Sequence, residues 1–152
     1  MKHITGKKKG LRCKIIIFLR PSEKNKEKGG TLLGIHVGLR HVIISEYITL
    51  FELLVVEIKI GNTQLRVIAG YSPQENFIPA EITTFYTTLE EEISSAELNG
   101  CSIIIAMDAN CKLGSQYVPG DPKEQTPNGS LLAGIVDRHA RCVANGLQKK
   151  KD

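Results

Sequence analysis

The sequence predicts an α/β domain. Aliphatic and β-branched runs separated by glycine pairs predict strands, and two stretches with helical periodicity predict helices. One of these helices leads directly into the most apolar strand of the chain. The length of 152 residues suits a single domain, and a compact chain of this size buries roughly 68–70% of its unfolded surface.

The first half of the chain is expected to be mostly strand. Residues 1–13 are basic and show little periodicity, and a charged loop at 21–28 is followed by Gly29-Gly30. The strands are expected at residues 14–19, 31–37, 42–45, 51–60 and 64–69.

A hairpin is predicted around Gly61-Asn62. These two residues separate the run 51–60 from the alternating run 64–69, and such a break between two strands favours a tight turn. Gly70-Tyr71-Ser72-Pro73 closes the second strand, so Tyr71 should stand near a strand end beside a stiff turn.

An amphipathic helix is predicted over residues 80–98. Its acidic residues fall mostly off the apolar stripe, and Asn99-Gly100 is typical of a helix C-terminus. The apolar stripe is expected to be core: Ile82, Phe85, Tyr86, Leu89, Ile93 and Ala96.

The run from Cys101 to Asn110 is expected to be a buried strand that ends at a polar site. It contains three isoleucines, and Asp108 is its first charge. Ligands of open α/β sheets usually bind at the carboxyl ends of strands. Asp108 and Asn110 are two residues apart, so in extended chain they point to the same side.

This pair of side chains suits phosphoester cleavage. A carboxylate can orient a water molecule and accept its proton, and a neutral amide can donate to a phosphate oxygen. The alternative is that Asp108, Ala109 and Asn110 only begin a turn, because Asp and Asn favour turns. The residues alone leave both interpretations open.

A long loop and a second helix follow. The loop runs to Gly129 and is rich in proline and glycine, and loops of this length are often functional. A helix is predicted over residues 130–144, ending at Asn145-Gly146.

The net charge of +4 is unevenly distributed. Residues 1–28 hold ten Lys or Arg against two Glu, a charge of +8, and residues 149–152 add +2. Residues 29–148 carry −6. We therefore expect a flexible basic arm at 1–28, a folded domain at 29–148 and a basic tail at 149–152. A basic arm can bind nucleic acid through its phosphates.

Several function classes are not expected. With 5% aromatic residues and no Trp, stacking platforms for single strands are not expected. The four cysteines form no C-x-x-C pair, so a zinc site is not expected either. The apolar run 15–19 is too short for an export signal, and no stretch is long enough to span a membrane. We expect reduced cysteines and an intracellular protein, cytoplasmic or nuclear.

The order of these motifs resembles the endonuclease/exonuclease/phosphatase superfamily, most closely the endonuclease domain of non-LTR retrotransposons. The similarity extends over residues 29–147. Its motifs are Gly29-Gly30 before a strand, Tyr71-Ser72-Pro73, the apolar strand into Asp108-Ala109-Asn110, Asn128-Gly129-Ser130-Leu131-Leu132, and Asn145-Gly146-Leu147.

The resemblance implies a partial α/β sandwich of mixed β-sheets flanked by helices. It also implies a Mg²⁺-dependent endonuclease that hydrolyses DNA phosphodiesters. Asp108 would be the base that activates water, and Asn110 and Tyr71 would position the scissile phosphate.

The sequence departs from the family pattern in three respects. Met107 stands where the family usually has glycine. The early glutamate that binds the metal is not found, because Glu23 and Glu27 lie in a charged loop, so the metal ligands are unknown. The closing strands with their serine-aspartate-histidine motif are also missing, so the match covers about the middle half of a domain. Such losses should expose sheet edges and lower stability.

Two alternatives to a nuclease stay open. The chain can be a non-catalytic remnant that binds nucleic acid weakly through residues 1–28. It can also be an unrelated α/β domain in which Asp108 caps a strand. The sequence does not fix the oligomeric state.

Overall fold

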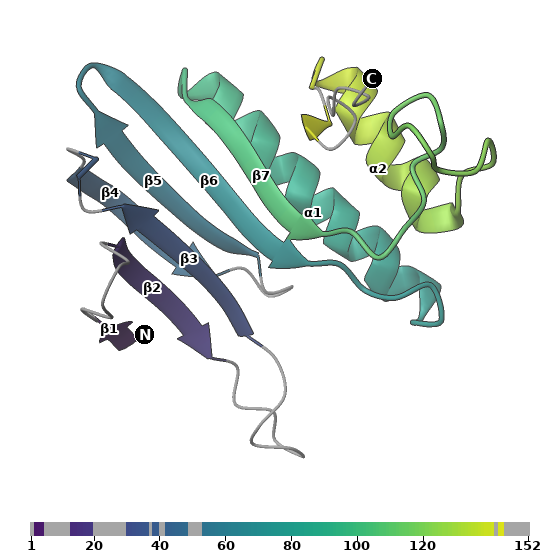
Figure 1. Ribbon diagram of the computed structural model, residues 1–152, viewed down its shortest axis with the longest axis horizontal. Coiled ribbons are helices and arrows are strands. Elements are labelled where there is room, and N and C mark those ends of the chain that lie inside the picture. Colours follow the sequence, from purple (N-terminus) through teal and green to yellow (C-terminus); the bar gives the residue numbers. More distant parts are fainter. Residues whose placement is uncertain are drawn as a thin grey trace, which may run out of the picture. The chain divides into compact units, whose positions relative to one another are not determined.

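The computed structural model confirms an α/β fold (Figure 1). It describes residues 2–4, 13–19, 30–36, 38–39, 42–48, 53–141 and 143–144. The elements are β1 (Lys2–Ile4), β2 (Cys13–Leu19), β3 (Gly30–His36), β4 (Val42–Ile48), β5 (Leu54–Ile60), β6 (Thr63–Tyr71), α1 (Pro79–Leu98), β7 (Ser102–Asp108) and α2 (Pro127–Arg138).

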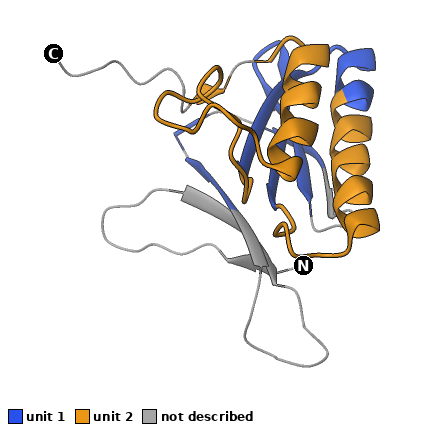
Figure 2. Cartoon of the chain, turned by 90° about the vertical axis from the view of Figure 1, so that its right-hand side faces the viewer, with its two compact units in different colours: residues 1–71, 94–107 blue, residues 72–93, 108–152 orange. Residues whose placement is uncertain are grey.

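The chain divides into two compact units (Figure 2). The first contains residues 1–71 and 94–107, and the second contains residues 72–93 and 108–152. The chain thus enters the second unit directly after Tyr71, and again directly after Met107. The domain limits at residues 28 and 148 stay predictions.

Three strands of the first unit form an antiparallel sheet in the order β1-β2-β3. The strand predicted at 14–19 is confirmed as β2, and that at 31–37 as β3. Both β1 and β2 lie within residues 1–28, which we expected to be a loose arm. The other residues of that segment lie outside the described ranges.

The second sheet has the order β4-β5-β6-β7 and is mixed. Antiparallel pairing joins β4 to β5 and β5 to β6, whereas β6 and β7 run in the same direction with α1 between them in the sequence (Figure 1). The predicted hairpin is confirmed, since Ile60 pairs with Thr63 across Gly61-Asn62. Gly61 has a φ of 58°, which glycine adopts without strain.

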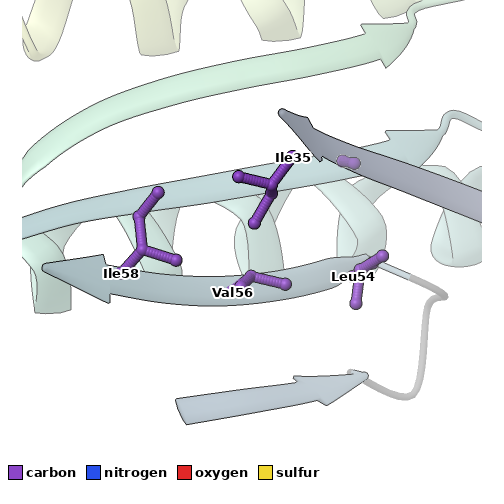
Figure 3. Close-up of a cluster of buried hydrophobic side chains, with 5 residues drawn as sticks. Ile35, Leu54, Val56 and Ile58 are labelled. Atoms are coloured by element: carbon purple, nitrogen blue, oxygen red, sulfur yellow. The ribbon is translucent and has the colours of Figure 1, made fainter. Parts of the chain in front are cut away.

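A cluster of aliphatic side chains forms the core of the first unit. Ile35 reaches from β3 toward the row Leu54, Val56 and Ile58 on β5, and Ala69 of β6 completes the cluster (Figure 3). The two sheets therefore share one core, as expected of a sandwich.

Strand β7 corrects one prediction. The run was expected to be a buried strand, but its residues are only half buried or exposed, and Ile104 is 51% exposed. The physical reason is the sheet order, because β7 has β6 on one side and is the last strand of the described sheet. An apolar composition alone does not distinguish a central strand from an end strand.

Helix α1 matches its predicted limits and its predicted stripe. All six apolar residues expected in the core are buried. The backbone N–H of Gly100 donates to Glu97, and that of Cys101 donates to Ala96, while Gly100 has a φ of 67°. This is the Schellman arrangement that a glycine after a helix favours.

Helix α2 was predicted with the wrong limits. It begins at Pro127 and ends at Arg138, rather than covering residues 130–144. Thr126 caps it by accepting from the N–H of Gly129 at 3.3 Å, and Pro127 occupies the first turn. The helix ends because Ala140 takes a φ of 47° and its N–H turns back to Asp137. The expected cap at 145–146 lies outside the described residues.

A buried ion pair links two strands of the second sheet. Arg66 of β6 donates through Nε to Glu57 of β5 at 2.8 Å, and a second guanidinium nitrogen contacts the same carboxylate. Both residues are buried, and they lie directly opposite each other in the strand register. Burying charge is tolerated here because each charge has an opposite partner.

Within the described ranges, neither α1 nor α2 is both long enough and apolar enough to cross a membrane.

Substitution of Gly129 should destabilise the protein. A Cβ at this position would lie 1.9 Å from the carbonyl oxygen of Lys112, so backbone would have to move. We expect Gly129→Ala to lower the free energy of unfolding by about 2 kcal/mol or more, measured by urea denaturation. Gly134→Ala, in the same helix, meets only the end of the Arg138 side chain and should stay within about 1 kcal/mol of wild type. Equal stability of the two variants would contradict the close approach at Gly129.

Loss of the Glu57 charge should also destabilise the protein, because Arg66 would stay buried without its carboxylate partner. We expect Glu57→Gln to cost about 3 kcal/mol in urea denaturation. The double variant Glu57→Leu with Arg66→Leu should cost less than Glu57→Gln, since no charge then remains buried. A larger loss of unfolding free energy in the double variant would show that the attraction between Glu57 and Arg66 exceeds the cost of removing both charges from water.

Candidate functional site

Asp108 is the last residue of β7, and its side chain is exposed. Its backbone carbonyl accepts a hydrogen bond from the N–H of Ser72 at 2.9 Å. The residue that follows β6 is therefore bonded to the residue that ends β7. Both residues belong to the second unit.

Asn110 is bonded to both of these residues. Its backbone N–H donates to Oδ1 of Asp108 at 3.2 Å, and its side-chain Nδ2 donates to the carbonyl oxygen of Ser72 at 2.7 Å. Its φ of 43° lies in the left-handed region, which Asn tolerates better than most residues. We call residues 108–110 the 108–110 turn. Asp108 and Asn110 are thus bonded within the turn, but not through the extended chain that their spacing predicts, because Asn110 has a left-handed backbone.

The same bonds limit what each group can still do. One amide N–H of Asn110 holds Ser72, and the other makes no hydrogen bond within the described part of the chain. Oδ1 of Asp108 accepts from the turn, whereas Oδ2 makes no hydrogen bond to any described residue. Among the described residues, Asp108 thus keeps one carboxylate oxygen, and Asn110 one amide N–H, without a hydrogen bond.

Tyr71 is the last residue of β6, and its side chain is 51% exposed. Its position at a strand end, beside Ser72-Pro73, is as predicted. It belongs to the first unit, whereas Asp108 and Asn110 belong to the second. Its role in holding a phosphate stays a prediction.

Two buried hydroxyl groups lie against the 108–110 turn. The hydroxyl of Ser72 donates to the carbonyl oxygen of Ala109 at 2.7 Å, and that of Tyr86 lies 3.3 Å from Ser72 Oγ and 3.5 Å from the same carbonyl. Either hydroxyl can donate in the contact between Ser72 and Tyr86, and the Tyr86 hydroxyl can also donate to the Ala109 carbonyl. Burial is the main cause that raises the pKa of Tyr86 to about 12, so this donor stays protonated at neutral pH.

Asn128 holds the next residue of the same segment. It lies in the first turn of α2, is fully buried, and donates through Nδ2 to the carbonyl oxygen of Pro73 at 2.9 Å. Its Oδ1 is buried and has no hydrogen-bond partner in the part of the chain that the structure describes. Ser72 and Pro73 are therefore anchored by the 108–110 turn and by α2.

Cys111 follows the turn directly and is not a reactive thiol. Its pKa is raised to about 11, chiefly by burial and further by the carboxylates of Glu75, Asp121 and Asp108. The thiol is protonated at neutral pH and is a poor nucleophile. Cys101 and Cys111 are both free cysteines.

The described residues do not form a metal site. No group of three or more His, Cys, Asp or Glu side chains gathers among them in a way that could hold an ion. Mg²⁺ is typically held by one or two carboxylates together with substrate phosphates and water. The described residues offer no larger cluster of ligands, so by themselves they do not complete a site for the metal that the resemblance implies.

The sequence did not indicate that Ser72 and Tyr86 contact the 108–110 turn through their hydroxyl groups. Tyr86 was assigned to the apolar core, where it does lie, but its hydroxyl has a polar role as well. Ser72 was noted only as part of a motif. A small hydroxyl residue between Tyr71 and Pro73 was the available signal, but its partners are 14 and 37 residues away in the sequence.

No protein-family model matches the chain, and no curated protein matches its sequence.

Two substitutions of Asn110 should separate the contribution of its side-chain hydrogen bond from that of its left-handed backbone. Asn110→Gly loses the bond to Ser72 but accepts the left-handed backbone, and should cost about 1 kcal/mol of unfolding free energy. Asn110→Ala loses the same bond and adds backbone strain, so it should cost roughly 1 kcal/mol more. Urea denaturation of both variants measures the difference. The described geometry would be contradicted if Asn110→Ala were the more stable of the two.

Proposed function

We propose that the chain derives from a DNA endonuclease domain that hydrolyses phosphodiester bonds, with Asp108 as the general base. The observation that carries this proposal is the exposed Asp108 carboxylate at the carboxyl end of β7, held by the N–H of Asn110. A fixed carboxylate with one oxygen that bonds to no described residue can orient a water molecule and accept its proton. The order of the motifs in the sequence supports the same family.

Asn110 and Tyr71 are proposed to hold the phosphate. The second amide N–H of Asn110 is the donor for a phosphate oxygen, since the first is bonded to Ser72. Tyr71 offers a half-exposed side chain from the residue before Ser72. Neither residue repels a phosphate, because both are neutral.

We include Mg²⁺ in the proposal on the resemblance alone. Its ligands would have to come in part from residues outside the described ranges or from the substrate. A DNA substrate also agrees with a cytoplasmic or nuclear protein whose cysteines stay reduced.

The contact between Asp108 and Asn110 also fits a residue that only shapes a turn. Asp108→Asn distinguishes the two roles. An asparagine keeps an oxygen that accepts from the N–H of Asn110, so the turn survives, but it cannot take a proton from water. Asp108→Ala would remove both functions at once and is less informative.

The test is nicking of supercoiled plasmid DNA by the purified 152-residue chain. We expect nicking with Mg²⁺, none with EDTA, and a loss of roughly 100-fold or more in Asp108→Asn, the usual contribution of a general base. Glu91→Gln, which removes an exposed carboxylate on α1, is the matched control and should nick as wild type does. Circular dichroism establishes that each variant is folded.

Two results would overturn the proposal. One is a folded wild-type chain that does not nick, and the other is an Asp108→Asn variant that nicks as fast as wild type. DNA binding that falls steeply with salt and is unchanged in Asp108→Asn would instead indicate a remnant that binds through residues 1–28.

A further inference from the structure

The 108–110 turn is built on Ser72, which is fully buried. Ser72 uses its N–H on the Asp108 carbonyl, its carbonyl on the Asn110 amide, and its hydroxyl on the Ala109 carbonyl. One residue thus contacts all three residues of the turn.

Of these three hydrogen bonds, the one to the Ala109 carbonyl is made by the side chain of Ser72. The other two bonds use the backbone and survive any substitution at position 72 that keeps its conformation. At 2.7 Å, the bond to Ala109 is the shortest of the three contacts of the Ser72 hydroxyl, since the Pro73 carbonyl lies at 3.1 Å and the Tyr86 hydroxyl at 3.3 Å. Fixing the Ala109 carbonyl fixes the peptide unit that joins Ala109 to the left-handed Asn110.

The Tyr86 hydroxyl lies against the serine. It is 3.3 Å from Ser72 Oγ and 3.5 Å from the Ala109 carbonyl. When Tyr86 donates to Oγ, the serine proton is directed at the Ala109 carbonyl, 2.7 Å away. Tyr86 is itself held in α1 with its ring edge-on to Phe85, at a centroid distance of 5.2 Å.

We propose that Ser72, oriented by Tyr86, is a positioning residue that holds the Asp108 carboxylate and the Asn110 amide in a fixed relation. This role deepens the proposed nuclease function, and its kinetic consequence rests on that function. Ser72 touches no substrate in this role and acts only through the 108–110 turn. A misplacement of about 1 Å in a catalytic group can cost 100-fold in rate, so a loose turn should be visible in kcat.

The first test reads the turn directly and does not need activity. The side-chain amide of Asn110 is followed by ¹H–¹⁵N NMR, and its hydrogen exchange is compared in wild type, Ser72→Ala and Tyr86→Phe. We expect exchange at Asn110 to rise by about tenfold or more in Ser72→Ala, while amides of β5 and β6 change much less, because opening is local. Tyr86→Phe keeps the ring and should show a smaller rise.

Thr84→Ala is the matched control. The Thr84 hydroxyl also donates to a backbone carbonyl at 2.7 Å, that of Ala80. Thr84 lies in the same helix as Tyr86, but this hydrogen bond does not involve the 108–110 turn. Its loss should leave Asn110 exchange unchanged. Ser72→Cys keeps the shape of serine with a weaker donor and should fall between wild type and Ser72→Ala.

The second test uses plasmid nicking. Ser72→Ala should lower kcat by roughly tenfold to 100-fold and change KM less, because the Asp108 base loses its position while the backbone carbonyl of residue 72 still accepts from the Asn110 amide. Ser72→Cys should recover part of kcat. Thr84→Ala should retain both constants.

The outcomes separate the two proposals. A wild type that does not nick, with the expected rise in Asn110 exchange, overturns the nuclease function and supports the positioning role in the turn. Unchanged Asn110 exchange in both Ser72→Ala and Tyr86→Phe overturns the positioning role, whatever the activity. A rise in exchange that is equal across β5, β6 and Asn110 shows a purely structural serine and also overturns it. If Ser72→Ala does not fold, Tyr86→Phe and Ser72→Cys decide between these results.

Discussion

The hydrogen bonds of Ser72 are the constraint on which the candidate site depends. Strands β6 and β7 are neighbours that run in the same direction, so the segments that leave them emerge at the same edge of the sheet. Segments that leave a sheet lose their ladder partners, and their polar backbone groups need others. Ser72 supplies partners to the 108–110 turn through its N–H, its carbonyl and its hydroxyl.

This arrangement explains why Asn110 is suited to its position. Its left-handed backbone turns the chain away from β7, and its side chain bonds back to Ser72. Aspartate would tolerate the backbone as well, but a carboxylate would repel the Ser72 carbonyl. The amide is thus required by the turn itself, and the same amide retains a second N–H for another partner.

The local features of the fold were predictable from the sequence because their causes are local. Gly61-Asn62 between two strand-like runs determined the hairpin, and Gly100 after an apolar stripe determined the end of α1. The start of α2 was missed because Pro127-Asn128-Gly129 are turn-formers, although Thr126-Pro127 is also a helix start. The two meanings are distinguished by tertiary contacts, because Thr126 accepts from the N–H of Lys112 and a Cβ at Gly129 would meet the Lys112 carbonyl.

Features that depend on distant residues were not predictable in the same way. Strand β7 is exposed because it lies at the end of the described sheet. The amino-acid sequence of a single strand does not reveal its position in the strand order. The i, i+2 spacing of Asp108 and Asn110 predicted two side chains on the same side of an extended chain, whereas the structure turns the backbone at Asn110 to a φ of 43°. The spacing could not reveal Ser72 and Tyr86, because helical periodicity explains Tyr86 fully as a core residue and gives no information on its hydroxyl.

The most direct measurement of the Ser72 constraint is the scalar coupling across the hydrogen bond from the Ser72 amide nitrogen to the Asp108 carbonyl carbon, detected by NMR on labelled wild-type protein. The structure predicts a detectable coupling together with slow exchange of the Ser72 amide, because this N–H lies 2.9 Å from its acceptor in a buried residue. No coupling, with exchange as fast as in an unfolded peptide, would contradict the bond between the ends of β6 and β7 and with it the basis of the candidate site.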